Sequence, residues 1–152
     1  MIVDAQVGFA GYGSDLIDAI TNELSRLSKD DVVIVVEYNG FGSTGSEVME
    51  AVRSSSCKWF VVSKVGDDGS EAVLSCCARN DLTPKAIRLV GLYRNWCVKS
   101  TAIGLAMKRP DATVIVSLPA TSDASWNGWV VKGSGRLLVE GVRSYKNIRV
   151  AE

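Results

Sequence analysis

Three side chains that could support nucleophilic chemistry each follow a separate apolar segment of the chain: Asp4, Lys64 and Cys97. Cys97 lies where a helix is expected to begin, and the positive end of a helix dipole favours the nucleophilic thiolate over the thiol. The charge of Lys64 could hold that thiolate or a developing oxyanion. Because the sequence contains no histidine, a carboxylate such as Asp4 is the natural base for the thiol proton. Taken alone, each residue is more typical of a structural role, but their shared position at strand ends favours a cysteine nucleophile that is activated without imidazole.

The apolar segments before these residues are short and rich in β-branched side chains, as in strands that are covered on both faces. Strands are predicted at residues 2–3, 32–36, 59–62, 87–90, 113–118 and 148–150, and helices at residues 15–27, 46–53, 70–78, 95–108 and 135–145. This alternation indicates an α/β fold, a three-layer α-β-α sandwich with a mostly parallel, six-stranded, Rossmann-like sheet. Ligands of such sheets bind beyond the carboxyl ends of the strands, where the three side chains are expected to lie.

Length and composition predict one globular domain over residues 1–152. The 17 basic and 17 acidic residues leave no net charge, which argues against a nucleic-acid partner. The lack of histidine excludes zinc sites built on imidazole, and the four cysteines form no C-x-x-C pair, so we expect no metal and no cofactor. No apolar stretch approaches the roughly 20 residues of a membrane span, and no signal peptide is evident, so we expect a cytoplasmic protein without a membrane partner.

Around these residues the sequence resembles the isochorismatase-like cysteine hydrolases, a family that includes nicotinamidases and carbamoyl-sarcosine amidases. Residues 3–9 (VDAQVGF) resemble the family's D-x-Q-x-x-F motif, and residues 62–64 resemble the strand end that carries its lysine. Residues 90–102 (VGLYRNWCVKSTA) resemble its G-x(5)-C-V-x-x-T-A signature. The match extends over most of the chain in the family's order.

The resemblance implies a catalytic triad in which Asp4 is the base, Lys64 the electrostatic partner and Cys97 the nucleophile. The implied reaction is hydrolysis of a small-molecule amide, or a related C–N bond, through a thioester. The resemblance also implies a cis peptide at Leu92–Tyr93, which would aim the N–H groups of Tyr93 and Cys97 into an oxyanion hole. A homo-oligomer is implied as well, because the family is commonly oligomeric.

Aromatic residues near the strand ends could stack on a planar substrate. The resemblance places Phe9 against the substrate, and Tyr38 and Trp96 are further candidates for substrate binding. The chain also departs from the family. Nicotinamidases hold a metal through an aspartate and several histidines after the second strand, and residues 37–41 (EYNGF) lack these ligands, which disfavours nicotinamide as the substrate. The chain is short between the second and third strands, so we expect a pocket that is more open or completed by a partner subunit.

Two alternative functions remain open. The chain could be a catalytically idle relative that binds a metabolite or a protein through the same pocket. Residues 40–45 (GFGSTG) also match G-x-G-x-x-G between a strand and a helix, which is the context of a dinucleotide site. However, they follow the second strand rather than the first, and the next strand ends in Lys64 instead of an acid that could hold a ribose. A flexible loop, left where the family's pocket segment is shortened, is the simpler interpretation of this motif.

Overall fold

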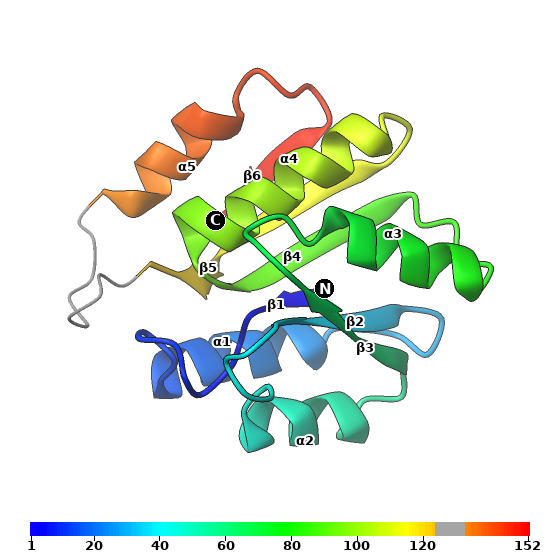
Figure 1. Cartoon of the computed structure of the whole chain (residues 1–152), viewed down its shortest axis with the longest axis vertical. Coiled ribbons are helices and arrows are strands. Elements are labelled where there is room, and N and C mark those ends of the chain that lie inside the picture. Colours follow the sequence, from blue (N-terminus) through cyan, green and yellow to red (C-terminus); the bar gives the residue numbers. More distant parts are fainter. Residues whose placement is uncertain (124–132) are drawn as a thin grey trace.

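The computed structural model describes residues 1–123 and 133–152. Strands and helices alternate in the predicted order (Figure 1). The strands are β1 (Ile2–Val3), β2 (Val32–Tyr38), β3 (Lys58–Lys64), β4 (Ala86–Leu92), β5 (Thr113–Ser122) and β6 (Ile148–Ala151). The helices are α1 (Ser14–Leu24), α2 (Ser46–Ser54), α3 (Ser70–Arg79), α4 (Lys99–Lys108) and α5 (Ser134–Val142), and a π-helical turn, η1 (Arg94–Val98), directly precedes α4.

The strands form one sheet in the order β3-β2-β1-β4-β5-β6, and each neighbouring pair is parallel. This confirms the predicted six-stranded α/β sandwich. From β1 the chain moves outward to β2 and β3, and then crosses back to β4 on the other side of β1. The order therefore reverses between β1 and β4, and a crevice for ligands is expected at the carboxyl ends of these two strands. Asp4 follows β1 and Cys97 follows β4.

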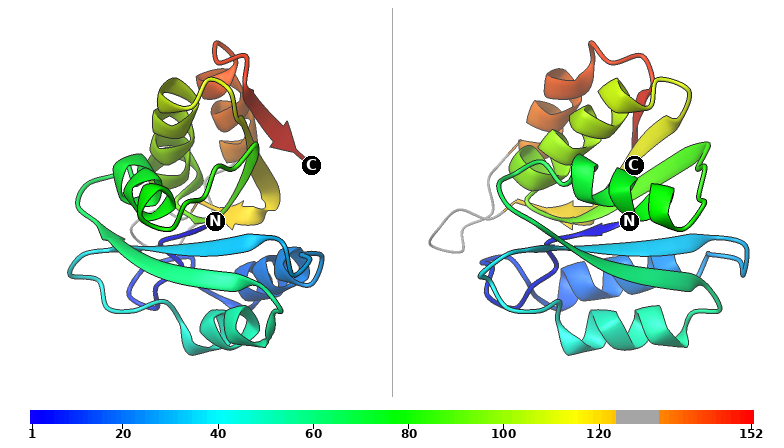
Figure 2. Two further views of the ribbon diagram at one scale, coloured as in Figure 1. Left: turned by 90° about the vertical axis from the view of Figure 1, so that its right-hand side faces the viewer. Right: turned by 45° about the vertical axis from the view of Figure 1, so that its right-hand side comes forward.

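Alternate side chains of each strand pack into two separate core layers. In β2, Ile34 and Val36 contact the layer of α3, α4 and α5, whereas Val33 and Val35 contact the layer of α1 and α2. Figure 2 shows the same division, with α1 and α2 on one face of the sheet and the other three helices on the opposite face. Because both faces of the sheet are covered, the strands are continuously apolar rather than alternating.

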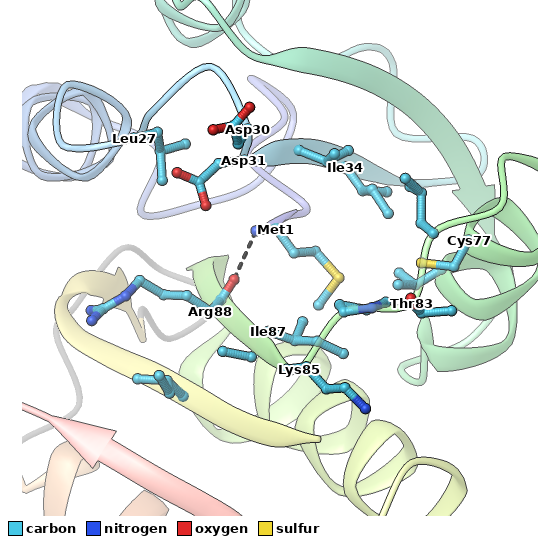
Figure 3. Close-up of a pocket in the computed structure, with 16 residues that line it drawn as sticks. Met1, Leu27, Asp30, Asp31, Ile34, Cys77, Thr83, Lys85, Ile87 and Arg88 are labelled. Carbon is cyan, nitrogen blue, oxygen red and sulfur yellow. Dashed lines mark hydrogen bonds between the residues drawn. The ribbon is translucent and has the colours of Figure 1, made fainter. Parts of the chain in front are cut away.

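The amino end of β1 leaves a gap in the middle of the sheet. Its pairing begins at Ile2, opposite Val35 and Val90, whereas β2 and β4 begin several residues earlier. The gap is a cavity of about 560 Å³, lined by the first residues of β2 and β4 (Figure 3). In it the amino group of Met1 donates a hydrogen bond of 2.7 Å to the carbonyl of Arg88, and burial lowers the pKa of that amino group to about 6. This cavity lies at the amino ends of the strands, whereas Asp4 lies at their carboxyl ends. The cavity is therefore separate from the predicted site.

Two elements differ from the sequence prediction in ways that affect the site. The helix predicted from residue 95 begins instead as the π-helical turn η1, and the regular helix starts at Lys99. Strand β5 continues past Pro119 to Ser122, because a register shift between Leu89 and Gly91 of β4 allows pairing to resume; a proline normally marks a strand end. Among residues 1–123 and 133–152, no helix is long and apolar enough to cross a membrane.

Candidate active site

Asp4 and Lys64 form a buried ion pair at the carboxyl ends of β1 and β3. The Lys64 Nζ atom lies 2.9 Å from Oδ2 of Asp4, and the two side chains are 2% and 0% exposed. The same Nζ donates a hydrogen bond of 2.8 Å to the carbonyl of Gly66 and lies 4.3 Å from the centre of the Tyr38 ring, a cation–π contact. The Asp4 carboxylate is thus fully buried, with a positive charge beside it.

The backbone at Asp4 directs its carboxylate into the site. Its φ angle is +50°, in the left-handed region that aspartate tolerates better than most residues. Its N–H still donates a hydrogen bond of 2.9 Å to the carbonyl of Val36, so the chain leaves the sheet only after this residue. The sharp change of direction turns the side chain towards Lys64 across the end of β2.

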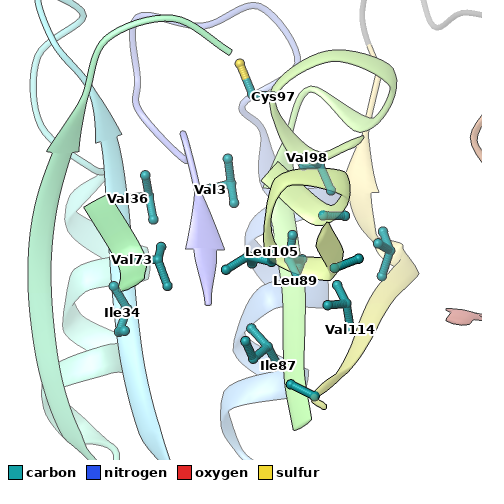
Figure 4. Close-up of a cluster of buried hydrophobic side chains, with 14 of the residues drawn as sticks. Val3, Ile34, Val36, Val73, Ile87, Leu89, Cys97, Val98, Leu105 and Val114 are labelled. Carbon is teal, nitrogen blue, oxygen red and sulfur yellow. The ribbon is translucent and has the colours of Figure 1, made fainter. Parts of the chain in front are cut away.

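Cys97 lies in η1, just beyond the end of β4, with 4% of its surface exposed. Figure 4 places it at the end of the apolar core towards which the strands point. Burial, together with the hydrogen bond and charge of Asp4, raises the pKa of the Cys97 thiol to about 12, although the charge of Lys64 acts in the opposite direction. This shift is opposite to the lowering expected from a helix dipole, because desolvation of the sulfur and the nearby carboxylate both raise the thiol pKa.

The pKa of Asp4 is also raised, first by burial and also by the charge of Asp67, while the Cys97 thiol and Lys64 lower it. A higher pKa makes this carboxylate a stronger base than an exposed aspartate. The Asp4 carboxylate and the Cys97 thiol therefore each change the pKa of the other.

The segment between β4 and Cys97 is shaped by its backbone. Gly91 has a φ angle of +117°, and a Cβ atom there would lie only 2.0 Å from the carbonyl oxygen of Val3, so only glycine lets β4 approach β1 this closely. The peptide between Leu92 and Tyr93 is cis, as the family resemblance implies. The carbonyl of Tyr93 then accepts hydrogen bonds of 3.0 Å from two residues of η1, Trp96 and Val98. These contacts fix the turn that carries Cys97.

The two residues before Trp96 anchor η1 to the neighbouring elements. Arg94 donates hydrogen bonds to the hydroxyl groups of Thr121 (3.0 Å) and Ser134 (2.6 Å). Asn95 donates one of 2.6 Å to the carboxylate of Asp123. These bonds connect η1 to the end of β5 and the start of α5, and so hold the position of the sulfur.

Sequence reasoning missed Asp67, which lies beside the sulfur. Its Oδ1 atom is 3.8 Å from Sγ of Cys97, and its side chain is exposed. Buried Thr101 holds this loop in place: its hydroxyl accepts the N–H of Gly69 at 2.9 Å and lies 3.4 Å from the carbonyl oxygen of Asp67. The available signal in the sequence was an acidic residue that follows the strand end at Lys64.

The aromatic residues named from the sequence contact one another in a chain that reaches Tyr38, the ring beside Lys64. Phe9 stacks on Phe41 with ring centres 4.5 Å apart and an angle of 11° between the rings. It also meets Tyr38 and Tyr93 edge-on, at 6.2 and 5.5 Å. Tyr93 in turn contacts Trp96 at 5.6 Å. Phe41 and Trp96 are 43% and 60% exposed, so aromatic surface is accessible next to the site.

The glycine-rich loop at residues 40–45 is tied to the end of β1. The Gln6 side chain donates to the carbonyls of Tyr38 (3.0 Å) and Gly42 (2.5 Å) and accepts the N–H of Tyr38 at 2.7 Å. The N–H of Thr44 donates to the carboxylate of Glu37 at 2.7 Å. A phosphate site needs backbone N–H groups that point at the ligand, whereas this loop has an N–H group bound to a carboxylate. These contacts disfavour the dinucleotide hypothesis.

Within the described residues, no group of three or more histidine, cysteine, aspartate or glutamate side chains is arranged to hold a metal ion.

No protein-family model and no curated protein matches the sequence. Solved structures do share its fold. An isochorismatase family protein aligns with a TM-score of 0.73 at 11% identity, over 99% of this chain and 95% of the other. N-carbamoylsarcosine amidase from Thermoplasma acidophilum aligns with a TM-score of 0.66 at 19% identity, over 99% and 93% of the chains. MAR1 ribonuclease from Caenorhabditis elegans aligns with a TM-score of 0.68 at 16% identity, over 99% and 74%.

These similarities define the class of architecture. The chain has the isochorismatase-like α/β fold over nearly its whole length. The resemblance first seen in three short motifs is thereby confirmed at the level of the fold.

Proposed function

We propose that this chain is a cysteine hydrolase that cleaves a small amide or a related C–N bond through a thioester intermediate. The observation that supports the proposal is the buried ion pair of Asp4 and Lys64, 2.9 Å long, together with the influence of both residues on the pKa of the Cys97 thiol. The proposed activity needs no metal, since the sequence lacks the histidines with which nicotinamidases hold one.

In the proposed reaction, Sγ of Cys97 attacks the carbonyl carbon of the amide while its proton passes to Asp4. Lys64 compensates the negative charge that moves between these two groups. The backbone N–H groups of Tyr93 and Cys97 stabilise the oxyanion of the tetrahedral intermediate. Asp4 then returns the proton to the departing nitrogen, which leaves as ammonia or an amine. Water finally hydrolyses the thioester and releases a carboxylic acid.

The surroundings of the site favour a small substrate with a planar or apolar group. Phe9, Tyr38 and Trp96 would contact that group, because the Tyr38 ring contacts Lys64, Phe9 contacts Tyr38, and Trp96 is largely exposed. RNA, the substrate class of the ribonuclease with a similar fold, is not proposed here. The 17 basic residues are matched by 17 acidic ones, so the chain has no excess of positive charge for a phosphate backbone.

The proposal is tested by measuring ammonia release from a panel of small primary amides. We expect turnover of at least one amide by the wild-type protein and a loss of about 1,000-fold or more in Cys97→Ser, since removal of a nucleophile disables the whole triad. Cys57→Ser is the matched control, because Cys57 is also buried but lies in the core layer of α1 and α2. Binding of an amide with no product from the wild-type protein would favour the catalytically idle alternative.

A further inference from the structure

Two carboxylates flank the sulfur of Cys97, and they differ in their access to water. Asp4 is fully buried and is ion-paired with Lys64. Asp67 is exposed, and its Oδ1 atom lies 3.8 Å from Sγ. In Figure 4 the chain that leaves β3 arches over to Cys97 from beyond the strand ends. The sulfur thus has one acid–base group on its buried side and another on its solvent side.

In the loop between β3 and α3, the carboxylate of Asp67, and not that of Asp68, lies beside the Cys97 sulfur. The Asp68 carboxylate accepts the N–H of Ser70 at 2.8 Å and contacts the Ser70 hydroxyl at 3.0 Å, so it is engaged at the start of α3. The Thr101 hydroxyl holds the backbone of the same loop through the N–H of Gly69. Asp67 is therefore held by its backbone while its carboxylate remains accessible.

The two halves of a thioester mechanism place different demands on a base. In the first half, a base must take a proton from a buried thiol, and Asp4 satisfies this requirement. In the second half, a water molecule must attack the thioester, and it has to arrive from the accessible side of the sulfur. A base for this water must lie within hydrogen-bond reach of a position beside the thioester carbon. Asp67 is the carboxylate on that side.

We propose that Asp67 is the general base for hydrolysis of the thioester on Cys97, an inference that rests on the proposed cysteine hydrolase function. Asp67 takes one proton from water as the water oxygen bonds to the thioester carbon. The tetrahedral intermediate collapses, the C–S bond breaks, and the carboxylic acid leaves. The electrons of that bond return to sulfur, which regains a proton from the protonated Asp67. Atoms and charge are balanced without any further reactant.

The test uses p-nitrophenyl acetate as an acyl donor, because it acylates a reactive cysteine and its release of p-nitrophenolate separates the two halves of the reaction. The burst of product reports acylation of Cys97, and the later steady rate reports hydrolysis of the acetyl thioester. We expect Asp67→Asn to keep the burst rate within about two-fold and to slow the steady rate by about 100-fold, the usual size of a general-base contribution. Mass spectrometry should then show acetylated Cys97 accumulating in this variant. Asp67→Glu should recover part of the steady rate.

Asp68→Asn is the matched control, since it removes a neighbouring carboxylate that faces α3, and it should leave both phases unchanged. Equal slowing of both phases in Asp67→Asn, or no effect on either, overturns the role of Asp67 while leaving the cysteine hydrolase proposal intact. A wild-type protein that gives no burst dependent on Cys97 overturns both proposals. Circular dichroism of each variant confirms that it is folded before its kinetics are compared.

Discussion

The amino group of Lys64 and the carboxylate of Asp4 meet across the end of β2, the strand that separates β3 from β1 in the sheet. Both side chains are inaccessible to water, so each charge depends on the other for compensation. Removal of one member of such a pair leaves a buried charge and typically costs about 3–5 kcal/mol. The pair therefore matters for folding as well as for the chemistry proposed at Cys97.

Double substitution of the pair should be less harmful than the single changes suggest. We expect Lys64→Met to lower the free energy of unfolding by about 3–5 kcal/mol at neutral pH. Adding Asp4→Asn removes the unpaired charge, so the double variant should be at least about 1 kcal/mol more stable than the sum of the two single effects predicts. Urea denaturation of the four proteins measures this coupling. Strictly additive effects would show that the ion pair contributes nothing to stability.

The contribution of Asp4 to stability should fall as pH rises. Burial raises its pKa above the usual 3.8, so the folded state holds this proton more tightly than the unfolded state does. The resulting stabilisation is complete below the unfolded pKa and is lost as pH rises through the folded pKa. We therefore expect the stability difference between the wild-type protein and Asp4→Asn to shift in favour of the variant as pH rises above about 4, the unfolded pKa of an aspartate. An opposite slope in urea denaturation would mean that Lys64 dominates the Asp4 pKa.

Loss of Asp4 should make Cys97 more acidic in the free protein. The hydrogen bond and charge of Asp4 both help to raise the pKa of this thiol to about 12. Alkylation of Cys97 by iodoacetamide at about pH 8 should thus be faster in Asp4→Asn than in the wild-type protein, and slower in Lys64→Met. Ammonia release should be lost in both variants, because neither retains the whole triad. Peptide mapping measures alkylation at Cys97, and slower alkylation in Asp4→Asn would contradict the proposed coupling.

Gly91→Ala should destabilise the protein strongly. The added Cβ atom would lie 2.0 Å from the carbonyl oxygen of Val3, and the φ angle of +117° is strained for any residue other than glycine. Together these effects should cost more than about 3 kcal/mol. Gly13→Ala is the control, since nothing lies within 4 Å of the corresponding Cβ position. Similar melting temperatures for the two variants would show that β1 and β4 can separate without loss of the fold.

The glycine-rich loop should not bind dinucleotides. The N–H of Thr44 is engaged by Glu37, and Gln6 holds the loop through Tyr38 and Gly42. We therefore expect no change in melting temperature with NAD or NADP at millimolar concentration, because a ligand that binds the folded state would raise it. A clear increase with either compound would restore the dinucleotide hypothesis.

The layered fold could be predicted from the sequence, because β-branched segments and amphipathic segments alternate regularly along it. The positions of Asp4, Lys64 and Cys97 at the strand ends follow from that alternation, since parallel strands end at the same edge of a sheet. The cis peptide before Tyr93 was accessible in a different way, through resemblance to a family signature, and no local propensity indicated it.

The electrostatic state of the site was not accessible from the sequence. Position at a helix start suggested an acidic Cys97, but its pKa depends on burial and on distances to Asp4 and Lys64 that only the folded chain defines. Asp67 was missed for a similar reason. It lies in a loop without periodic pattern, and its place beside the sulfur depends on a hydrogen bond between Gly69 and Thr101 of another element.

Because β1 is so short, a ligand bound at the carboxyl ends of the strands could stabilise the centre of the sheet. Strand β1 has only two residues, and it alone lies between the β2–β3 portion of the sheet and the β4–β6 portion. Lys64 and Tyr38 belong to the β2–β3 portion, whereas Cys97 follows β4 and belongs to the other portion. A ligand that contacts both portions would link them, so its binding should stabilise the folded protein against separation of the sheet at β1.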